Sequence, residues 1–295
     1  MDQFLQALIN GVMLGGYYSA MVLGFSVIWG VMGVINLAHG EFIMLGAYLT
    51  WLLNTQYNWE PFLALIVVMP TMFVLGYILQ RVLINRVVER PHLISLLVTF
   101  ALGIIIANSA KLIFSADPRL TDSSLSGFWR VGNVTLPVTK TYILAAALII
   151  MGGLYLFLQK TRLGKSIRAA AQNKEAARMV GIEIDTIYAI TFGLCIALTG
   201  AAGMLVSPTR AVFPFMGPPL TLKAFAITAM SGLGSIPGAL FGGLVLGLVE
   251  VFIGTYVSGV GTNVGIVSSF VLLVVVLVTR PQGLFGGLKP ATEVQ

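Results

Sequence analysis

Residues 271–278 read VLLVVVLV, an unbroken apolar run without a polar side chain. A strand of a membrane barrel alternates apolar and polar side chains over about ten residues. This run does not alternate, and it lies in a nearly charge-free window at residues 262–279. A helix needs about 20 mainly apolar residues to cross roughly 30 Å of hydrocarbon. The stretch therefore predicts a membrane helix and excludes a barrel.

The same pattern recurs along the whole chain. Nine apolar windows lie at residues 5–30, 36–54, 61–80, 92–113, 141–159, 186–206, 211–231, 237–256 and 262–279. We expect an all-α, polytopic transmembrane helix bundle with eight to nine membrane segments. Residues 1–295 are predicted to form a single transmembrane domain.

The composition agrees with a lipid environment. Of the 295 residues, 57% are hydrophobic and only 9% are charged, whereas a soluble domain carries about 25% charged residues. The lone cysteine, Cys195, excludes an internal disulfide and a four-thiolate metal site. Residues 1–4 lack the positive segment of a signal peptide, so the first window is expected to be retained.

Lysine and arginine predict the orientation, because cytoplasmic loops carry an excess of them. The larger group lies in residues 81–90, 160–185 and the tail: Arg81, Arg86, Arg90, Lys160, Arg162, Lys165, Arg168, Lys174, Arg178, Arg280 and Lys289. The smaller group is Lys111, Arg119, Arg130, Lys140 and Arg210, and Lys223 falls inside a window. The first group is predicted to face the cytoplasm and the N-terminus to lie outside. The net charge of +6 then reflects topology, and no nucleic acid is expected as a partner.

The stretch 207–236 interrupts the hydrophobic pattern. It contains Pro208, Pro214, Pro218, Pro219, Gly232 and Gly234. Irregular backbone survives at membrane depth only where protein buries it or water reaches it. We therefore expect a broken or re-entrant segment here, and a candidate transport pathway.

The sequence offers no catalytic site. The outer loop at about 114–140, with a hairpin pattern around Gly132 and Asn133, is too short for a catalytic domain. His39 and His92 are the only histidines, and neither a Gly-x-Ser-x-Gly nor a His-Glu-x-x-His motif occurs. We predict no catalytic residues, no metal ligands and no enzyme activity.

Residues 36–42, NLAHGEF, place polar groups at the edge of an apolar window. Asn36 is predicted to cap the helix, and Glu41 suits its positive end. The alternative is that Asn36, His39, Gly40 and Glu41 line a pathway, where free N–H groups meet a carboxylate-bearing substrate.

Small residues recur every four positions at Gly11, Gly15 and Ser19, and at Gly16, Ala20 and Gly24, which favours close helix packing. Ser235, Pro237 and Gly238 form a strong helix start. In that helix Glu250 shares a face with Gly243 and Gly247, so it is expected to point into protein and to need a partner. A structural hydrogen bond and a role in the substrate path both remain open.

The basic loop at about 160–185 predicts one short helix outside the membrane. Ser166 is a candidate N-cap and Gly181 a C-terminal stop. Ile167, Ala170, Ala171 and Met179 form its expected apolar face, which rests either on anionic membrane lipid or on a cytoplasmic partner. Gly164-Lys165-Ser166 imitates the end of a phosphate loop, but Gln159 replaces the required first glycine. We therefore expect no ATP site in this chain.

Three ordered motifs now point to a known family: residues 36–42, residues 161–182 and residues 232–243, GLGSIPGALFGG. From Gly11 to about Phe285, the chain resembles the inner-membrane permeases of bacterial branched-chain amino acid ABC transporters, and the H-type subunit among them. The resemblance implies three kinds of partner: a homologous second permease, two cytoplasmic ATPase subunits that bind the ATP, and a periplasmic substrate-binding protein.

The resemblance also assigns a role to the basic loop. In this family the matching segment contacts the ATPases, which implies that role for Gly164, Arg168, Ala169, Asn173, Ala177 and Gly181. The implied substrates are branched-chain or other neutral amino acids, although the wider family also moves urea and short amides. The rival hypothesis is a stand-alone secondary transporter or channel that uses Glu41 and Glu250 as ion sites.

Overall fold

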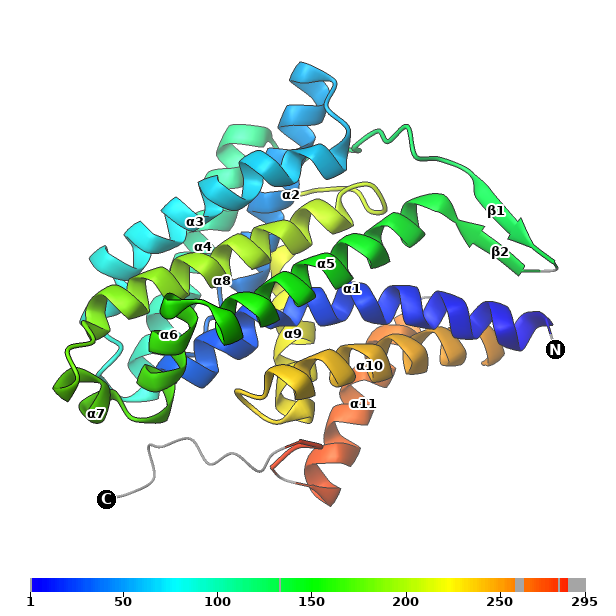
Figure 1. The fold of residues 1–295 in the computed structure, drawn as a ribbon. Coiled ribbons are helices and arrows are strands. Elements are labelled where there is room, and N and C mark those ends of the chain that lie inside the picture. The colour runs from blue at the N-terminus through cyan, green and yellow to red at the C-terminus, as the bar shows by residue number, and fades with distance from the viewer. Residues whose placement is uncertain (1, 133, 258–262, 281, 286–295) are drawn as a thin grey trace.

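Each of the nine apolar windows contains a helix in the computed structural model, which describes residues 2–132, 134–257, 263–280 and 282–285. A two-stranded antiparallel hairpin accompanies the helices (Figure 1). The elements in chain order are α1 (Asp2–Met32), α2 (His39–Tyr57), η1 (Pro61–Ala64), α3 (Leu65–Val82), η2 (Ile84–Arg86), α4 (His92–Phe114), β1 (Phe128–Val131), β2 (Val134–Pro137), α5 (Val138–Lys160), α6 (Arg162–Gln172), α7 (Lys174–Met179), α8 (Ile184–Val206), α9 (Gly217–Ser231), α10 (Ile236–Tyr256) and α11 (Asn263–Thr279).

Membrane-spanning character is clear for part of this set. Among the described residues, six helical segments are long and apolar enough to cross a bilayer: α1, the segment Pro61–Arg86, α4, α5, α8 and α10. The helices α2, α9 and α11 are outside this group. A polytopic helix bundle is therefore confirmed, while the number of eight to nine crossings stays a prediction.

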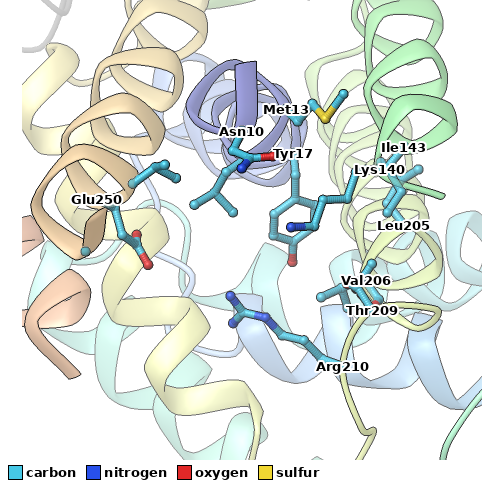
Figure 2. A pocket seen from close by; sticks show the side chains of 13 residues that line it. Asn10, Met13, Tyr17, Lys140, Ile143, Leu205, Val206, Thr209, Arg210 and Glu250 are labelled. Carbon is cyan, nitrogen blue, oxygen red and sulfur yellow. Dashed lines mark hydrogen bonds between the residues drawn. The ribbon is translucent and has the colours of Figure 1, made fainter. Parts of the chain in front are cut away.

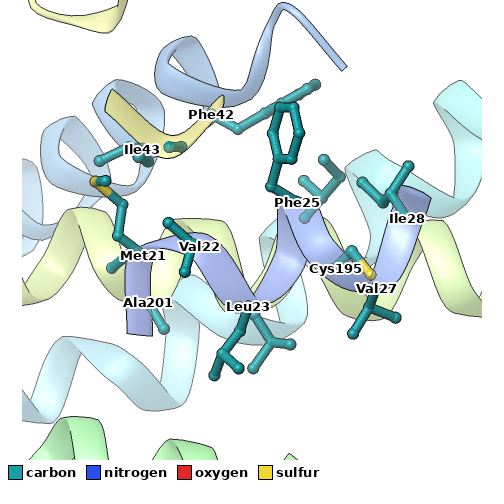
Figure 3. Close-up of a cluster of buried hydrophobic side chains, with 14 of the residues drawn as sticks. Met21, Val22, Leu23, Phe25, Val27, Ile28, Phe42, Ile43, Cys195 and Ala201 are labelled. Carbon is teal, nitrogen blue, oxygen red and sulfur yellow. The ribbon is translucent and has the colours of Figure 1, made fainter. Parts of the chain in front are cut away.

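The core forms where α1, α2 and α8 meet. In the most apolar windows of α1 and α8, 89% of the residues are buried, against 22% in the window of Pro61–Arg86. Phe25 of α1, Phe42 of α2 and Cys195 of α8 all lie in this core (Figure 3). The surrounding helices expose large apolar side chains such as Ile105 and Ile149, as expected of a surface that faces lipid or another subunit.

Small residues bring α1 and α10 together, as their spacing predicted. A β-carbon on Gly15 would lie 2.7 Å from the Leu244 backbone, and one on Gly247 would collide with Gly15. The other series of small residues, Gly16, Ala20 and Gly24, contacts different helices. Gly16 faces Leu144 of α5, and Gly24 faces the Cys195 carbonyl of α8. At Gly15, Gly24 and Gly247 glycine is needed because the neighbouring helix backbone itself is in contact, whereas Gly16 meets only the Leu144 side chain.

The bundle has two distinct ends (Figure 1). The β1–β2 hairpin and the start of α1 share one end, where Gln6 and Thr135 exchange hydrogen bonds of 2.8 and 2.9 Å. The α6 and α7 helices lie at the other end, here called the α7 end, where Lys174 and Glu89 form a 3.3 Å ion pair. This pair places the basic segments 81–90 and 160–185 on one side, as the sequence predicted. Lys289 lies outside the described residues.

The interrupted stretch is irregular over residues 207–216, and α9 begins only at Gly217. The predicted window 211–231 therefore starts six residues too early. The start of α9 carries prolines at its first turn, which suit a helix start and cannot continue a preceding one. With 15 residues, α9 is roughly 22 Å long, short of the roughly 30 Å hydrocarbon core.

Candidate functional site

The N-termini of α2 and α9 meet inside the bundle. The backbone N–H of Gly40 donates a 2.7 Å hydrogen bond to the Thr221 hydroxyl, and both groups are buried. A β-carbon on Gly40 would collide with the carbonyl oxygen of Gly217, so only glycine allows this approach. In Figure 1, α1, α5, α8 and α10 run in roughly one direction, and α2 and α9 lie at a steep angle to them. Two positive helix ends therefore converge in the protein interior.

Glu41 supplies the negative charge at this crossing. It is 5% exposed, its Oε2 lies 3.5 Å from the Thr221 hydroxyl, and its carboxylate packs against Gly217 at the start of α9. It also borders a cavity of about 340 Å³ with Phe100 and Ile104 of α4. The sequence predicted that Glu41 suits a positive helix end, and two such ends are present. The carboxylate that meets them in this structure is the protein's own.

Asn36 and His39 of this motif form hydrogen bonds with backbone groups. Asn36 is not the N-cap, because α2 begins at His39 and its N-cap residue, Ala38, makes no side-chain cap. Asn36 instead accepts a 3.1 Å bond from the Ala38 N–H, in a turn that precedes the helix. His39 is fully buried, and its Nε2–H donates to the Met21 carbonyl at 2.9 Å, since a carbonyl only accepts. The structure therefore brings Gly40 and Glu41 to the crossing and turns His39 toward α1.

Ser235, Pro237 and Gly238 lie beyond the other end of α9, where Ser235 precedes α10 and the other two belong to its first turn. The Ser235 hydroxyl accepts a 3.1 Å bond from the Gly238 N–H, which confirms the predicted cap, and Pro237 is in the first turn. The neighbouring Gly234 packs on Gly30 near the end of α1. The structure does not bring these residues together with Glu41.

Glu250 has the buried partner that its position demanded. Lys223 of α9 donates to both of its carboxylate oxygens, at 2.9 and 3.2 Å. Tyr18 of α1 donates to Glu250 at 2.8 Å and accepts from Lys223 at 2.7 Å. The two charged side chains are only 10% and 15% exposed. This cluster, here called the Lys223 triad, joins α1, α9 and α10.

Lys223 was given no role among the predicted residues, although the sequence contained a signal for it. A lone lysine in one apolar window and a lone glutamate in the next are both costly in a membrane unless they pair. Glu250 also lines a cavity of about 420 Å³ with Tyr17, Lys140 and Arg210 (Figure 2). Both open roles of Glu250, a structural bond and a place beside a cavity, thus have a geometric basis.

The basic loop forms two helices instead of one. Asn173 ends α6 and caps α7, because its side-chain oxygen accepts bonds of 3.0 Å from the N–H groups of Glu175 and Ala176. Thr161, not Ser166, caps α6, with a 2.9 Å bond from the Gly164 N–H. Ser166 lies in mid-helix and donates to the Arg162 carbonyl. Predicting a cap required knowing that α5 ends at Lys160.

Gly181 ends α7 as expected. Its φ of +84° is a conformation that glycine adopts freely. The Ile182 N–H bonds to the Ala177 carbonyl and the Gly181 N–H to the Arg178 carbonyl, both at 3.0 Å, which is a Schellman motif.

The α6–α7 pair has a buried side and an exposed side. Ile167, Ala170 and Ala177 are buried. Gly164 packs so closely on the Phe157 and Leu158 backbone that a β-carbon would clash. Met179 was expected on the apolar face but is 82% exposed, beside Val180 at 76%. Met179 lies on α7, which is a separate helix after Asn173, so it does not continue the apolar face of α6.

The remaining predicted coupling residues differ in their exposure. Arg168 and Asn173 are exposed and Ala169 is half-buried. Gly164-Lys165-Ser166 lies inside α6, which directly follows a helix, whereas a phosphate loop follows a strand.

Comparisons with known proteins extend these observations. Residues 7–278 match the family model described as branched-chain amino acid transport system / permease component. The chain is 31% identical to the Escherichia coli (strain K12) protein "High-affinity branched-chain amino acid transport system permease protein LivH". The alignment covers 98% of this chain and 97% of that protein. BraD of Pseudomonas aeruginosa, which carries the same description, is also 31% identical, with the same coverage.

A solved structure shares the fold. A chain of PsaBC from Streptococcus pneumoniae, solved in complex with a Fab, superposes with a TM-score of 0.50 at 16% identity. The match covers 96% of this chain and 93% of that one. Neither the secondary-transporter alternative nor the urea alternative gains support from any of these similarities.

Proposed function

The chain belongs to the family of branched-chain amino acid transport permease components, and we propose that it is a membrane subunit of an ATP-driven importer of branched-chain amino acids. Two relatives whose alignments each cover 98% of this chain are described as permeases of that transport class. The observation that carries the proposal is the crossing of α2 and α9. Helices that begin inside a membrane bundle are typical of transport pathways.

The partners in this proposal are a homologous second permease subunit, two cytoplasmic ATPase subunits and a periplasmic binding protein. The α6–α7 pair exposes the apolar side chains of Met179 and Val180 and the basic residues Arg168 and Arg178, which together suit an ATPase partner. ATP binding is assigned to the partner subunits, since residues 164–166 have no phosphate-loop geometry. We place the protein in a bacterial inner membrane, with the α7 end in the cytoplasm and the N-terminus outside. The basic residues of segments 81–90 and 160–185 support this orientation.

The proposed mechanism couples α6–α7 to the bundle. Gly164 sits directly on the end of α5, and Glu89 ties the loop after α3 to Lys174 and Arg178 at 3.3 and 3.6 Å. A displacement of α6–α7 by closing ATPases would therefore tilt α3 and α5. The chain would alternate between inward-open and outward-open states and form half of the pathway.

The test uses the assembled complex in proteoliposomes, with leucine uptake and ATP hydrolysis measured on the same preparation. Arg168→Glu reverses a charge on the proposed docking surface, and Gly181→Pro removes the N–H that closes α7. Both variants should lower the uptake per ATP hydrolysed while membrane insertion remains normal.

Arg130→Glu is the matched control, because Arg130 is exposed on β1 at the opposite end. It should leave the ratio of uptake to hydrolysis unchanged. Wild-type ratios in both α6–α7 variants would contradict the coupling proposal. Uptake by the isolated chain, driven by an ion gradient without ATPases, would contradict the importer proposal itself.

A further inference from the structure

The cavity of about 420 Å³ beside the Lys223 triad is a second feature that the sequence did not reveal (Figure 2). Its wall contains Asn10 of α1, Lys140 at the start of α5, Val206 at the end of α8 and Gly254 near the end of α10. These positions all lie toward the hairpin end of the bundle. Small-molecule sites have volumes of about 300 to 1,000 Å³, so the cavity can hold a small ligand.

Two polar atoms in the wall lack a partner. The hydroxyl of Tyr17 makes no hydrogen bond in the described structure, although the residue is only 5% exposed. The side-chain oxygen of Asn10 is in the same situation. Figure 2 shows the Tyr17 ring pointing from α1 into the cavity. Buried polar groups are nearly always satisfied in native proteins, so these atoms indicate a polar occupant.

The charges around the cavity favour a carboxylate. Within the described residues, neither Arg210 nor Lys140 forms an ion pair, and both line the cavity. Arg210 extends into it from the irregular segment after α8 (Figure 2). Lys223, in contrast, is neutralised by Glu250. The wall therefore carries an excess of positive charge, and arginine binds carboxylates through two parallel N–H groups.

Glu250 adds an acceptor on another wall of the cavity. Its carboxylate offers about four lone-pair positions, and Lys223 and Tyr18 occupy three of them. One position at Oε1 stays available to a donor. The rest of the lining is mainly apolar, with Met13, Ile143 and Leu205.

We propose that this cavity is a binding site for a zwitterionic α-amino acid with an apolar side chain. Arg210 and the Tyr17 hydroxyl bind the carboxylate, Glu250 accepts from the ammonium group, and the aliphatic side chain packs on Met13, Ile143 and Leu205. The ligand class rests on the proposed function, while the existence of a carboxylate site rests on the cavity itself.

Cysteine labelling tests the site without relying on transport. Gly254→Cys is the reporter, because Gly254 lines the cavity and a β-carbon there meets nothing within 4 Å. Cys195, the only native cysteine, is buried and should not react. The full-length chain in its assembled complex is treated with a negatively or a positively charged methanethiosulfonate, and the modification is measured by the intact mass of this chain.

The anionic reagent should react faster, on the order of tenfold, because a basic cleft concentrates anions. Adding Arg210→Gln should remove most of that preference. Leucine should slow the labelling in a saturable manner, and leucinol, which lacks the carboxylate, should not. Leu120→Cys, on the exposed outer loop, is the control and should show neither effect.

Equal rates for both reagents, or protection by leucinol as good as by leucine, would overturn the proposal. The failure of the two proposals can be told apart by ATP-driven uptake in the unmodified Gly254→Cys complex. Uptake without leucine protection means that the chain transports amino acids by another route. If even the wild-type complex shows no uptake, the proposed function itself is wrong.

Discussion

Replacing Glu250 with glutamine should destabilise the protein strongly, because it leaves a buried lysine without its counter-ion. Lys223 is 8% exposed and has both oxygens of Glu250 within 3.2 Å. Glutamine keeps the shape and an acceptor for the Tyr18 hydroxyl, but it removes the negative charge. Lys223→Met is the reciprocal change and leaves Glu250 unpaired.

The magnitude follows from the burial of both partners. Breaking a buried ion pair by removing one charge costs about 3–5 kcal/mol, while replacing both partners is often neutral. At roughly 2 °C per kcal/mol, each single variant should lower the melting temperature by about 6–10 °C. The double variant Lys223→Met/Glu250→Gln should recover most of that loss.

The assay is thermal unfolding of the purified chain in one detergent, followed by tryptophan fluorescence for the wild type, both single variants and the double variant. The four melting temperatures form a double-mutant cycle, in which coupled residues are strongly non-additive. Single shifts below about 2 °C, together with an additive double variant, would refute the view that this pair is a desolvated ionic contact.

Three further outcomes are expected. Gly40→Ala should cost about 1–3 kcal/mol, because its β-carbon collides with the Gly217 carbonyl; Gly152→Ala, where no atom lies within 4 Å, is the control and should not lower the melting temperature. Asn173→Ala should cost about 1 kcal/mol by removing the α7 cap, visible as faster hydrogen exchange in α7 alone, whereas exchange unchanged from wild type would argue against the cap. Burial raises the pKa of Glu60, but hydrogen bonds from Ser123 and Ser124 outweigh this and hold the pKa below its usual range. The hydrogen bonds that attach the outer loop to Glu60 should therefore be complete above the ordinary carboxyl pKa and be lost as the pH falls through the lowered pKa of Glu60. Proteolysis of residues 115–127 at different pH values measures this loss. A Glu60→Gln variant with the same pH profile as the wild type would contradict the prediction.

Much of the fold could be predicted from local patterns. The apolar windows predicted the helices, because the length of an apolar run is itself the physical requirement for a membrane segment. The spacing of Gly11, Gly15 and Ser19 predicted a close helix contact, which α10 provides. The Ser235 cap could be predicted because the capping side chain bonds to an N–H only three residues further along the chain.

Predictions failed where the outcome depended on a boundary or a neighbour. Ser166 was chosen as a cap because the end of α5 was unknown, and Thr161 holds that position. Asn36 has the right chemistry for a cap, but the helix starts three residues later. Met179 fits the apolar spacing of one continuous helix, whereas Asn173 divides the segment.

The sequence by itself determined that this protein is a helical membrane protein with most of its basic residues in one group of loops, since hydrophobicity and charge act on each segment independently. Only the tertiary structure decided which polar residues meet. Lys223 and Glu250 are 27 residues apart on different helices, and Tyr18 comes from a third. Gly40 finds Thr221 across 181 positions. Such contacts depend on the crossing of α2 and α9 and on the packing of α1 against α10, which no local pattern specifies.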